Sequence, residues 1–174
     1  DLGCDFFNKR EFIHLLMESN TNDRPSIRIP PPLLFFAFIA AGFLLDYLFP
    51  IKLFRLAWWP RIICGGLIFT ISGYLALGSI SVLLRNKTPF DPAKPTLKIV
   101  HQGPFRLSRN PMYLALLCLL AGVAVFTGSI WMCLAVPALF IILDIVVVRP
   151  EEEYLERNFG SQYLSYKVKV RRWL

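Results

Sequence analysis

Four long runs of apolar residues alternate along the chain with polar segments rich in lysine and arginine. The runs cover residues 33–49, 62–84, 112–126 and 130–148. A helix rises about 1.5 Å per residue, so about 20 residues are needed to cross the apolar core of a bilayer. The second and fourth runs reach this length, the first reaches it with Pro31 and Pro32, and the short third run joins the fourth through the turn 127–129. The pattern predicts an all-α polytopic membrane protein with about four transmembrane helices, of which the last two form a hairpin.

This pattern divides the chain into two expected parts. Residues 1–30 would form an N-terminal cytoplasmic segment, in which residues 6–17 are a candidate for an interfacial helix. Residues 31–174 would form the membrane domain. Its predicted parts are spans at about 31–49, 61–84, 111–127 and 129–148, a cytoplasmic loop over 85–110, and a C-terminal interfacial helix over 150–174.

Composition and charge agree with a membrane protein. The 174 residues are 55% hydrophobic and 18% charged, and the mean hydropathy is +0.51. With four spans, sixteen of the nineteen lysines and arginines fall on one side, and the positive-inside rule places that side, including both termini, in the cytoplasm. Contacts with anionic lipid headgroups account for the net charge of +7. We therefore expect the bilayer as a partner, no nucleic acid, and no obligate protein partner.

The motifs typical of soluble active sites are missing from the sequence. It has no glycine-rich nucleotide-binding fingerprint, no Walker lysine loop, no Ser-His-Asp candidate, and no histidines or cysteines at metal-ligand spacing. Three of the four cysteines lie within apolar runs, where they are interpreted as small buried hydrophobic residues. We expect neither a metal site nor a disulfide framework.

The loop between the second and third runs is a candidate for function. It is long for a connection and ends at Asn110 and Pro111, which favour a helix start as N-cap and first helical residue. The N-terminus of a helix favours an anionic group, and Arg109 lies beside it. A capped helix with an arginine at the lipid headgroups explains the same residues without a ligand. On this feature alone, the simpler interpretation is preferred.

A second candidate follows the fourth run, where Pro150 precedes the three glutamates 151–153. Carboxylates in the first turn of a helix oppose its positive dipole end, and this alone explains all three. If the helix were nearly continuous, however, Asp144 would share a face with the first two glutamates. A carboxylate inside an apolar run is a functional candidate, and pairing with Arg149 explains Asp144 equally well.

Together the two segments look like a known signature. The first block is Gly103-Pro104-Phe105-Arg106 followed by Arg109-Asn110-Pro111-Met112-Tyr113. The second block is Glu151-Glu152, Leu155, Phe159-Gly160, Tyr163, Tyr166 and Val170. In this order, with a transmembrane hairpin between them, the blocks resemble the signature of the isoprenylcysteine carboxyl methyltransferase and phospholipid methyltransferase superfamily of integral-membrane enzymes. The resemblance covers residues 97–170.

The resemblance implies S-adenosylmethionine as cofactor, with S-adenosylhomocysteine as product, in a cytoplasmic pocket that the loop and the C-terminal helix close. The residues that match cofactor-binding positions are Leu97, Lys98, Ile99, Val100, His101, Gly103, Phe105, Asn110, Pro111, Met112, Tyr113 and Glu151. The residues assigned to catalysis are Arg109, Arg149 and Glu152. Arg109 would lie near the carboxylate of the cofactor, Glu152 would orient neighbouring groups or the nucleophile, and Arg149 would contact the substrate. Taken alone, His101 is more typical of a solvated loop residue.

Two positions depart from the pattern of the superfamily. Asn110 stands where a histidine is usual, and an amide does not accept a proton near neutral pH, so no general base is assigned there. The arginine that contacts a substrate carboxylate in the carboxyl methyltransferases would fall at Val147, two residues before Arg149. The acceptor therefore stays open between a carboxylate, an amine and a thiol.

The function that we predict is S-adenosylmethionine-dependent methyl transfer to a lipid-like or small hydrophobic acceptor at the cytoplasmic face of the membrane. A phospholipid N-methyltransferase is an alternative within the superfamily. A non-catalytic membrane binding or scaffold protein that retains the fold is an alternative from another class. A channel or transporter is disfavoured, because four spans offer few polar groups within the membrane.

Overall fold

The computed structural model describes residues 29–53, 57–88 and 99–174. In these ranges the chain is helical and has no β-strand, only an isolated bridge between Lys52 and Ser129. The elements are α2 (Pro31–Leu48), α3 (Trp58–Arg85), the 3-10 turn η1 (Gly103–Arg106), α4 (Pro111–Thr127), α5 (Ile130–Leu143), the π-helical turn η2 (Asp144–Val148), α6 (Arg149–Phe159) and α7 (Ser161–Lys169). The interfacial helix considered for residues 6–17, and residues 89–98 of the predicted loop, lie outside the described residues.

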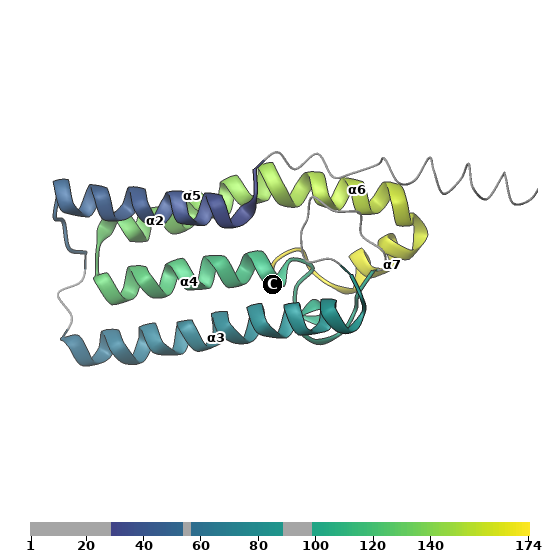
Figure 1. The fold of residues 1–174 in the computed structure, drawn as a ribbon, viewed down its shortest axis with the longest axis horizontal. Coiled ribbons are helices and arrows are strands. Elements are labelled where there is room, and N and C mark those ends of the chain that lie inside the picture. The colour runs from purple at the N-terminus through teal and green to yellow at the C-terminus, as the bar shows by residue number, and fades with distance from the viewer. Residues whose placement is uncertain (1–28, 54–56, 89–98) are drawn as a thin grey trace, which may run out of the picture.

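The four helices α2, α3, α4 and α5 run side by side in a bundle (Figure 1). α3 packs against α4, α4 against α5, and α5 against α2. Three helices are long and apolar enough to cross a membrane: α2, α3, and the continuous helix that begins with α5. α4 is a shorter apolar helix of 17 residues. The structure therefore confirms the predicted all-α polytopic membrane architecture.

The predicted hairpin is formed by α4 and α5. α4 begins at Pro111, as the sequence predicts. It ends before Gly128, whose φ of 63° lies in the left-handed region that glycine adopts without steric cost. Because the chain reverses at this turn, the N-terminus of α4 and the far end of α5 lie at the same end of the bundle.

The fourth span continues beyond the expected membrane boundary. α5 passes through η2 into α6 without a break, so one helix of 30 residues is formed. Pro150 has no backbone N–H to donate to the preceding turn, and the wider π turn ends two residues before it, at Val148. The single interfacial helix expected over 150–174 is corrected accordingly. α6 prolongs the span, Gly160 (φ 47°) separates α6 from α7, and the chain leaves the helix after Lys169.

The core of the bundle lies between α2, α4 and α5. Its fully buried side chains include Leu120, Met132, Leu139 and Leu143. Large apolar side chains on α2 and α3 are instead exposed, among them Phe36, Leu44, Ile63, Leu67 and Leu77. An apolar surface of this extent is typical of helices that face lipid.

The contact between α3 and η1 holds the functional loop against the bundle and can be tested by substitution. A Cβ added at Gly78 would lie 2.9 Å from Cγ of Pro104, whereas one added at Gly73 would meet no atom within 4 Å in the part of the chain that the structure describes. We predict that Gly78→Ala lowers the free energy of unfolding by about 1–3 kcal/mol, because the proline ring cannot turn aside without moving η1. Gly73→Ala should instead be neutral or raise it by about 0.5–1 kcal/mol, since alanine favours helix.

Thermal unfolding of both variants in the same detergent measures this difference. Equal shifts for the two glycines would contradict the contact between α3 and η1.

Candidate functional site

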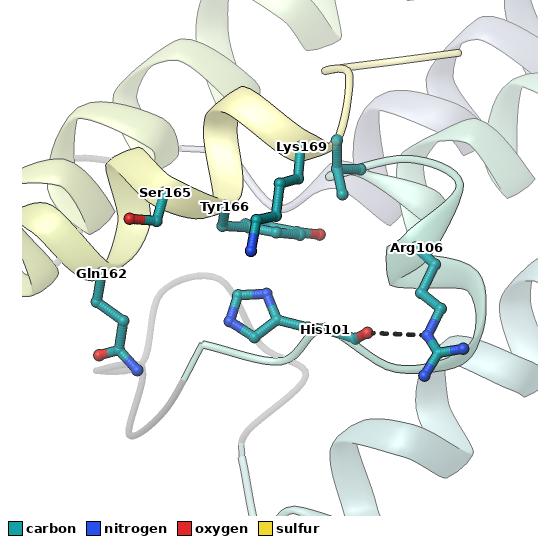
Figure 2. Close-up of a pocket in the computed structure, with 7 residues that line it drawn as sticks. His101, Arg106, Gln162, Ser165, Tyr166 and Lys169 are labelled. Atoms are coloured by element: carbon teal, nitrogen blue, oxygen red, sulfur yellow. Dashed lines mark hydrogen bonds between the residues drawn. The ribbon is translucent and has the colours of Figure 1, made fainter.

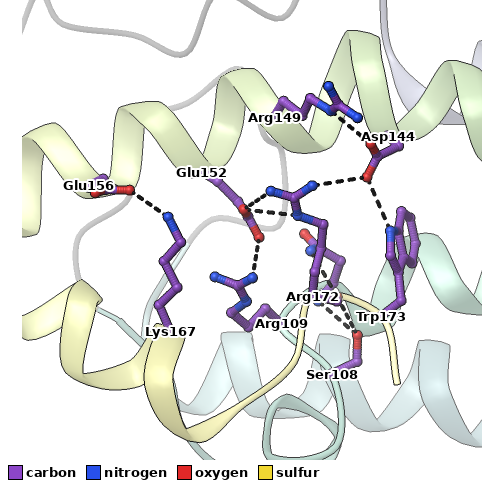
Figure 3. A network of polar contacts seen from close by, with 10 residues as sticks. Ser108, Arg109, Asp144, Arg149, Glu152, Glu156, Lys167, Arg172 and Trp173 are labelled. Carbon is purple, nitrogen blue, oxygen red and sulfur yellow. Dashed lines mark hydrogen bonds and ion pairs between the residues drawn. The ribbon is translucent and has the colours of Figure 1, made fainter.

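Helix α6 and the start of α4 lie toward the same end of the bundle (Figure 1), and charged side chains from α6, from the residues before α4 and from the C-terminal residues meet there (Figure 3). At their centre is the carboxylate of Glu152, a residue that is only 4% exposed. Its Oε2 accepts hydrogen bonds from Arg172 Nε at 3.1 Å and from Nη2 at 2.8 Å. Its Oε1 lies 3.3 Å from Arg109 Nη2. Glu152 thus connects an arginine that precedes α4 with an arginine near the C-terminus.

A second carboxylate, that of Asp144, extends this network toward α5. Its Oδ2 accepts a hydrogen bond from Arg149 Nε at 2.8 Å, and its Oδ1 accepts one from Trp173 Nε1 at 3.1 Å. Arg172 Nη1 lies 3.5 Å from the same Oδ1. Of the two interpretations of Asp144, the structure confirms pairing with Arg149.

Tyr113 and Glu151, one from each motif block, are in direct contact. The hydroxyl of Tyr113 donates a hydrogen bond of 2.7 Å to Glu151 Oε2. Tyr113 is buried in the first turn of α4, and Glu151 lies in the first turn of α6. The hairpin therefore brings together two residues 38 positions apart, both of which the resemblance assigns to cofactor binding.

Asn110 precedes α4 as predicted, but the expected cap by its side chain is wrong. Within the described residues its side chain makes no capping hydrogen bond to the first turn. Its Nδ2 donates instead to the Arg172 carbonyl at 3.1 Å, because the C-terminal segment passes within reach of the amide. Ser108 Oγ donates to the same carbonyl at 3.0 Å and accepts a hydrogen bond from the Asn110 backbone N–H. Asn110 therefore binds the C-terminal segment, and it leaves the first-turn N–H groups of α4 without a side-chain cap.

A separate pocket of about 530 Å³ lies between α7 and the loop that leads into η1 (Figure 2). It is lined by His101, Arg106, Gln162, Ser165, Tyr166, Lys169 and Val170. The Tyr166 hydroxyl donates a hydrogen bond of 2.7 Å to the Phe105 carbonyl, which ties α7 to η1. The His101 ring packs edge-on against the ring of Tyr166, with centroids 4.5 Å apart. The pocket is cationic at its rim and aromatic in part, and neither Tyr113 nor Glu151 lines it.

The structure divides the residues predicted from the sequence between these two places. At the N-terminus of α4 lie Arg109, Asn110, Pro111, Met112, Tyr113, Glu151 and Glu152. Near the pocket, His101 belongs to the lining and Phe105 contributes its carbonyl. Ile99 and Val100 are buried, and Ile99 packs in a cluster with Tyr163 and Tyr166.

The remaining predicted site residues are Gly103, Arg149, Leu97 and Lys98, and they are assigned to neither group. Gly103 (φ 56°) lies against α3, where an added Cβ would come within 3.0 Å of Val82, so its place in the structure is explained by packing. Arg149 lies at the edge of the network with a side chain that is 57% exposed. Leu97 and Lys98 lie outside the described residues.

Two buried tyrosines border these groups without serving as bases. Burial raises the pKa of Tyr166 to about 12, and it raises the pKa of Tyr163, which the nearby carboxylate of Glu152 raises further. Both phenols therefore stay neutral near neutral pH. The hydrogen bond to Glu152 raises the pKa of Arg172, so this side chain stays charged.

The structure adds residues that were not predicted as part of the site. Ser108, Arg172 and Trp173 all join the network, although the sequence analysis assigned none of the three to the site. The sequence does contain one signal for Arg172: the carboxylates of Asp144 and Glu152, in or beside an apolar run, need cationic partners. Among the described residues, no group of three or more histidine, cysteine, aspartate or glutamate side chains is placed to hold a metal ion.

Comparisons with known proteins show the family to which the chain belongs. A family model described as phospholipid methyltransferase matches residues 60–162, which is more than half of the chain. An uncharacterized protein of Haemophilus influenzae is 40% identical over 63 residues, which span all of that protein and 36% of this chain. The family match includes α3 from residue 60 onward, both motif blocks up to Gln162, and the hairpin between them. The resemblance is thereby confirmed, and the chain belongs to the phospholipid methyltransferase family of integral-membrane methyltransferases.

Proposed function

We propose that this membrane methyltransferase takes its methyl group from S-adenosylmethionine and transfers it to a lipid-like or small hydrophobic acceptor at the cytoplasmic face of the membrane. The observation that carries the proposal is the hydrogen bond between Tyr113 and Glu151, which joins the two motif blocks at the start of α4. Family membership supports the reaction type. The choice of S-adenosylmethionine as the methyl donor rests on the residues around the hydrogen bond between Tyr113 and Glu151.

These residues suit a cofactor that carries an amino acid. The Arg109 side chain is 8% exposed, and among the described residues its Nε and Nη1 make no hydrogen bond to a carboxylate; the group beside the guanidinium is the neutral phenol of Tyr163. Buried guanidinium N–H groups and the N-terminus of a helix both favour a carboxylate. Glu151, which accepts the hydrogen bond from Tyr113, offers an acceptor for an ammonium group or a ribose hydroxyl. Arg109, Tyr113 and Glu151 are therefore the residues that would hold S-adenosylmethionine.

S-adenosylmethionine supplies a methyl group on a positively charged sulfur, which makes the methyl carbon open to nucleophilic attack. The residues of the site then have to align the acceptor with that carbon and keep water away. Asn110 has no basic atom, and the phenols of Tyr163 and Tyr166 stay neutral, so none of the three is assigned to proton transfer. In this proposal the site acts mainly by orientation.

Arg149 is proposed to face the acceptor. It is paired with Asp144 but half exposed, at the point where α5 continues into α6. Ile141 and Ile145 on the same helix are exposed and apolar, which suits an acceptor that approaches laterally from the bilayer. Because the basic network lies at this end of the bundle, we place the end in the cytoplasm together with both termini.

A methyl-transfer assay on lipids tests the proposal. The purified protein would be reconstituted in vesicles that contain phosphatidylethanolamine and a prenylated cysteine analogue, and given S-adenosylmethionine with a labelled methyl group. We expect label in the extracted lipid fraction at a rate well above that of vesicles without protein. Separation of the lipids by head group then identifies the acceptor.

Each result of this assay decides between named alternatives. Base-stable label in the phospholipid head group identifies an amine acceptor and favours the N-methyltransferase, the alternative that the family description favours. Label released by mild base as methanol identifies a carboxylate acceptor. A folded protein that labels none of the supplied lipids would contradict methyl transfer to these acceptors and favour the non-catalytic alternative.

A further inference from the structure

The C-terminal strap, residues 170–173, is bound along the loop that precedes α4. After α7 the backbone of Val170 is extended, and the chain returns to the end of the bundle. The Arg109 backbone N–H donates a hydrogen bond of 3.0 Å to the Arg171 carbonyl. The Arg172 carbonyl accepts two more hydrogen bonds, from the side chains of Ser108 and Asn110. Three hydrogen bonds across more than 60 positions of sequence therefore set the place of the strap.

These backbone contacts direct the Arg172 side chain at Glu152. Two guanidinium nitrogens of Arg172 contact the same oxygen, Oε2, at 2.8 and 3.1 Å (Figure 3). A third contacts Asp144, which is also bound by the Trp173 indole. The Trp173 ring packs against Phe140, with centroids 4.9 Å apart. The strap thus occupies one of the two oxygens of the buried carboxylate.

The occupied oxygen has a consequence for Arg109. Arginine and a free carboxylate prefer to pair through two parallel N–H···O bonds. Here Glu152 offers Arg109 only Oε1, at 3.3 Å from Nη2, and Nε and Nη1 make no hydrogen bond to a carboxylate among the described residues; the neutral phenol of Tyr163 is the group beside them. Without Arg172, both oxygens of Glu152 would be available to Arg109. The strap therefore keeps two buried N–H groups of Arg109 available for another anion.

We propose that Arg172 is a positioning residue: by holding Glu152, it keeps the Arg109 guanidinium available for the carboxylate of the cofactor. This inference rests on the proposed function, since it concerns the same cofactor. Arg172 itself touches neither cofactor nor acceptor in this assignment.

The test compares two ligands that differ in that carboxylate. S-adenosylhomocysteine carries it, and 5′-methylthioadenosine lacks the amino acid part. Affinities of both would be measured by titration calorimetry for the wild-type protein, Arg172→Gln and Arg171→Gln. Arg171 is an exposed neighbour with the same charge, so its substitution is the matched control.

We expect Arg172→Gln to weaken S-adenosylhomocysteine about tenfold, the equivalent of one charge-assisted hydrogen bond, and to leave 5′-methylthioadenosine within about twofold. Arg171→Gln should leave both within about twofold. Adding Glu152→Gln to Arg172→Gln should restore affinity for S-adenosylhomocysteine, because the neutral amide no longer neutralises Arg109. If the single variant does not fold, the double variant, which removes the positive and the negative member of the pair together, is compared directly with Arg109→Gln in the same background.

Several outcomes overturn the inference. A folded Arg172→Gln that keeps wild-type affinity for both ligands excludes a positioning role, and an equal loss for both ligands indicates general structural damage instead. If, in the double-variant background, the affinity for S-adenosylhomocysteine is the same with Arg109 and with Arg109→Gln, then Arg109 does not bind the carboxylate of the ligand, and the positioning role of Arg172 is excluded as well. A wild-type protein that binds neither ligand overturns the proposed function and this inference with it, whereas normal wild-type binding with unaffected variants overturns this inference alone.

Discussion

Replacing Glu151 by alanine is expected to weaken binding of S-adenosylmethionine by about 100-fold while the protein stays folded in detergent. The Glu151 carboxylate is the acceptor of the Tyr113 hydroxyl and the proposed acceptor for the cofactor. Removing the acceptor of a buried hydrogen bond costs about 1–3 kcal/mol, and the Tyr113 hydroxyl, which is buried, loses the hydrogen bond to Glu151 as well. A loss of about 3 kcal/mol corresponds to the stated change in affinity.

The matched control for this prediction is Glu153→Ala. Glu153 lies two residues after Glu151, in the first turns of the same helix, and it is exposed. It is also a glutamate, so a general effect of removing an acidic side chain from this turn would appear in both variants. Titration calorimetry and thermal unfolding of both proteins give the comparison. Wild-type affinity in a folded Glu151→Ala protein would remove this residue from the cofactor site.

The second large effect concerns stability. Glu152→Gln should lower the free energy of unfolding by about 3–5 kcal/mol, because it leaves the buried guanidinium group of Arg109 without its carboxylate and removes one of the two carboxylates that Arg172 contacts. The control is Glu156→Gln, one turn further along α6. Its carboxylate pairs with Lys167 at 2.9 Å, but its side chain is 42% exposed, against 6% for Glu152. Exposed pairs of this kind contribute about 0–1 kcal/mol.

Thermal or denaturant unfolding in one detergent, with both variants at the same pH and salt, measures the contrast. Similar shifts for the two substitutions would contradict the view that the network around Glu152 is a buried structural unit.

The spans and the start of α4 follow from the sequence because their signals are local. A run of about 20 apolar residues is long enough to cross a bilayer, and Pro111 suits the first position of a helix. α4 begins at that residue, and it ends where Gly128 supplies a positive φ. The continuation of α5 into α6 through a π turn is harder to predict from the sequence, because Pro150 is compatible both with the start of a new helix and with a position just after a π turn.

The partners within the site were harder to predict, because they depend on contacts between distant residues. The contact between Tyr113 and Glu151 was reached only through the order of the two motif blocks. The sequence suggested a cap for Asn110, and the structure shows that its amide binds a carbonyl 62 positions away. The same separation explains why Arg172 was not predicted as part of the site: no periodicity indicates that the extended residues after α7 return to the start of α4.

The measurement that tests the central claim most directly is titration calorimetry of the purified wild-type protein with S-adenosylmethionine, S-adenosylhomocysteine and, as a control, ATP. We predict saturable binding of the first two ligands and none of ATP, because the site offers Arg109 and Glu151 for an amino acid group and lacks a phosphate-binding glycine loop. Absence of binding by S-adenosylmethionine in a sample with a cooperative unfolding transition would contradict the account.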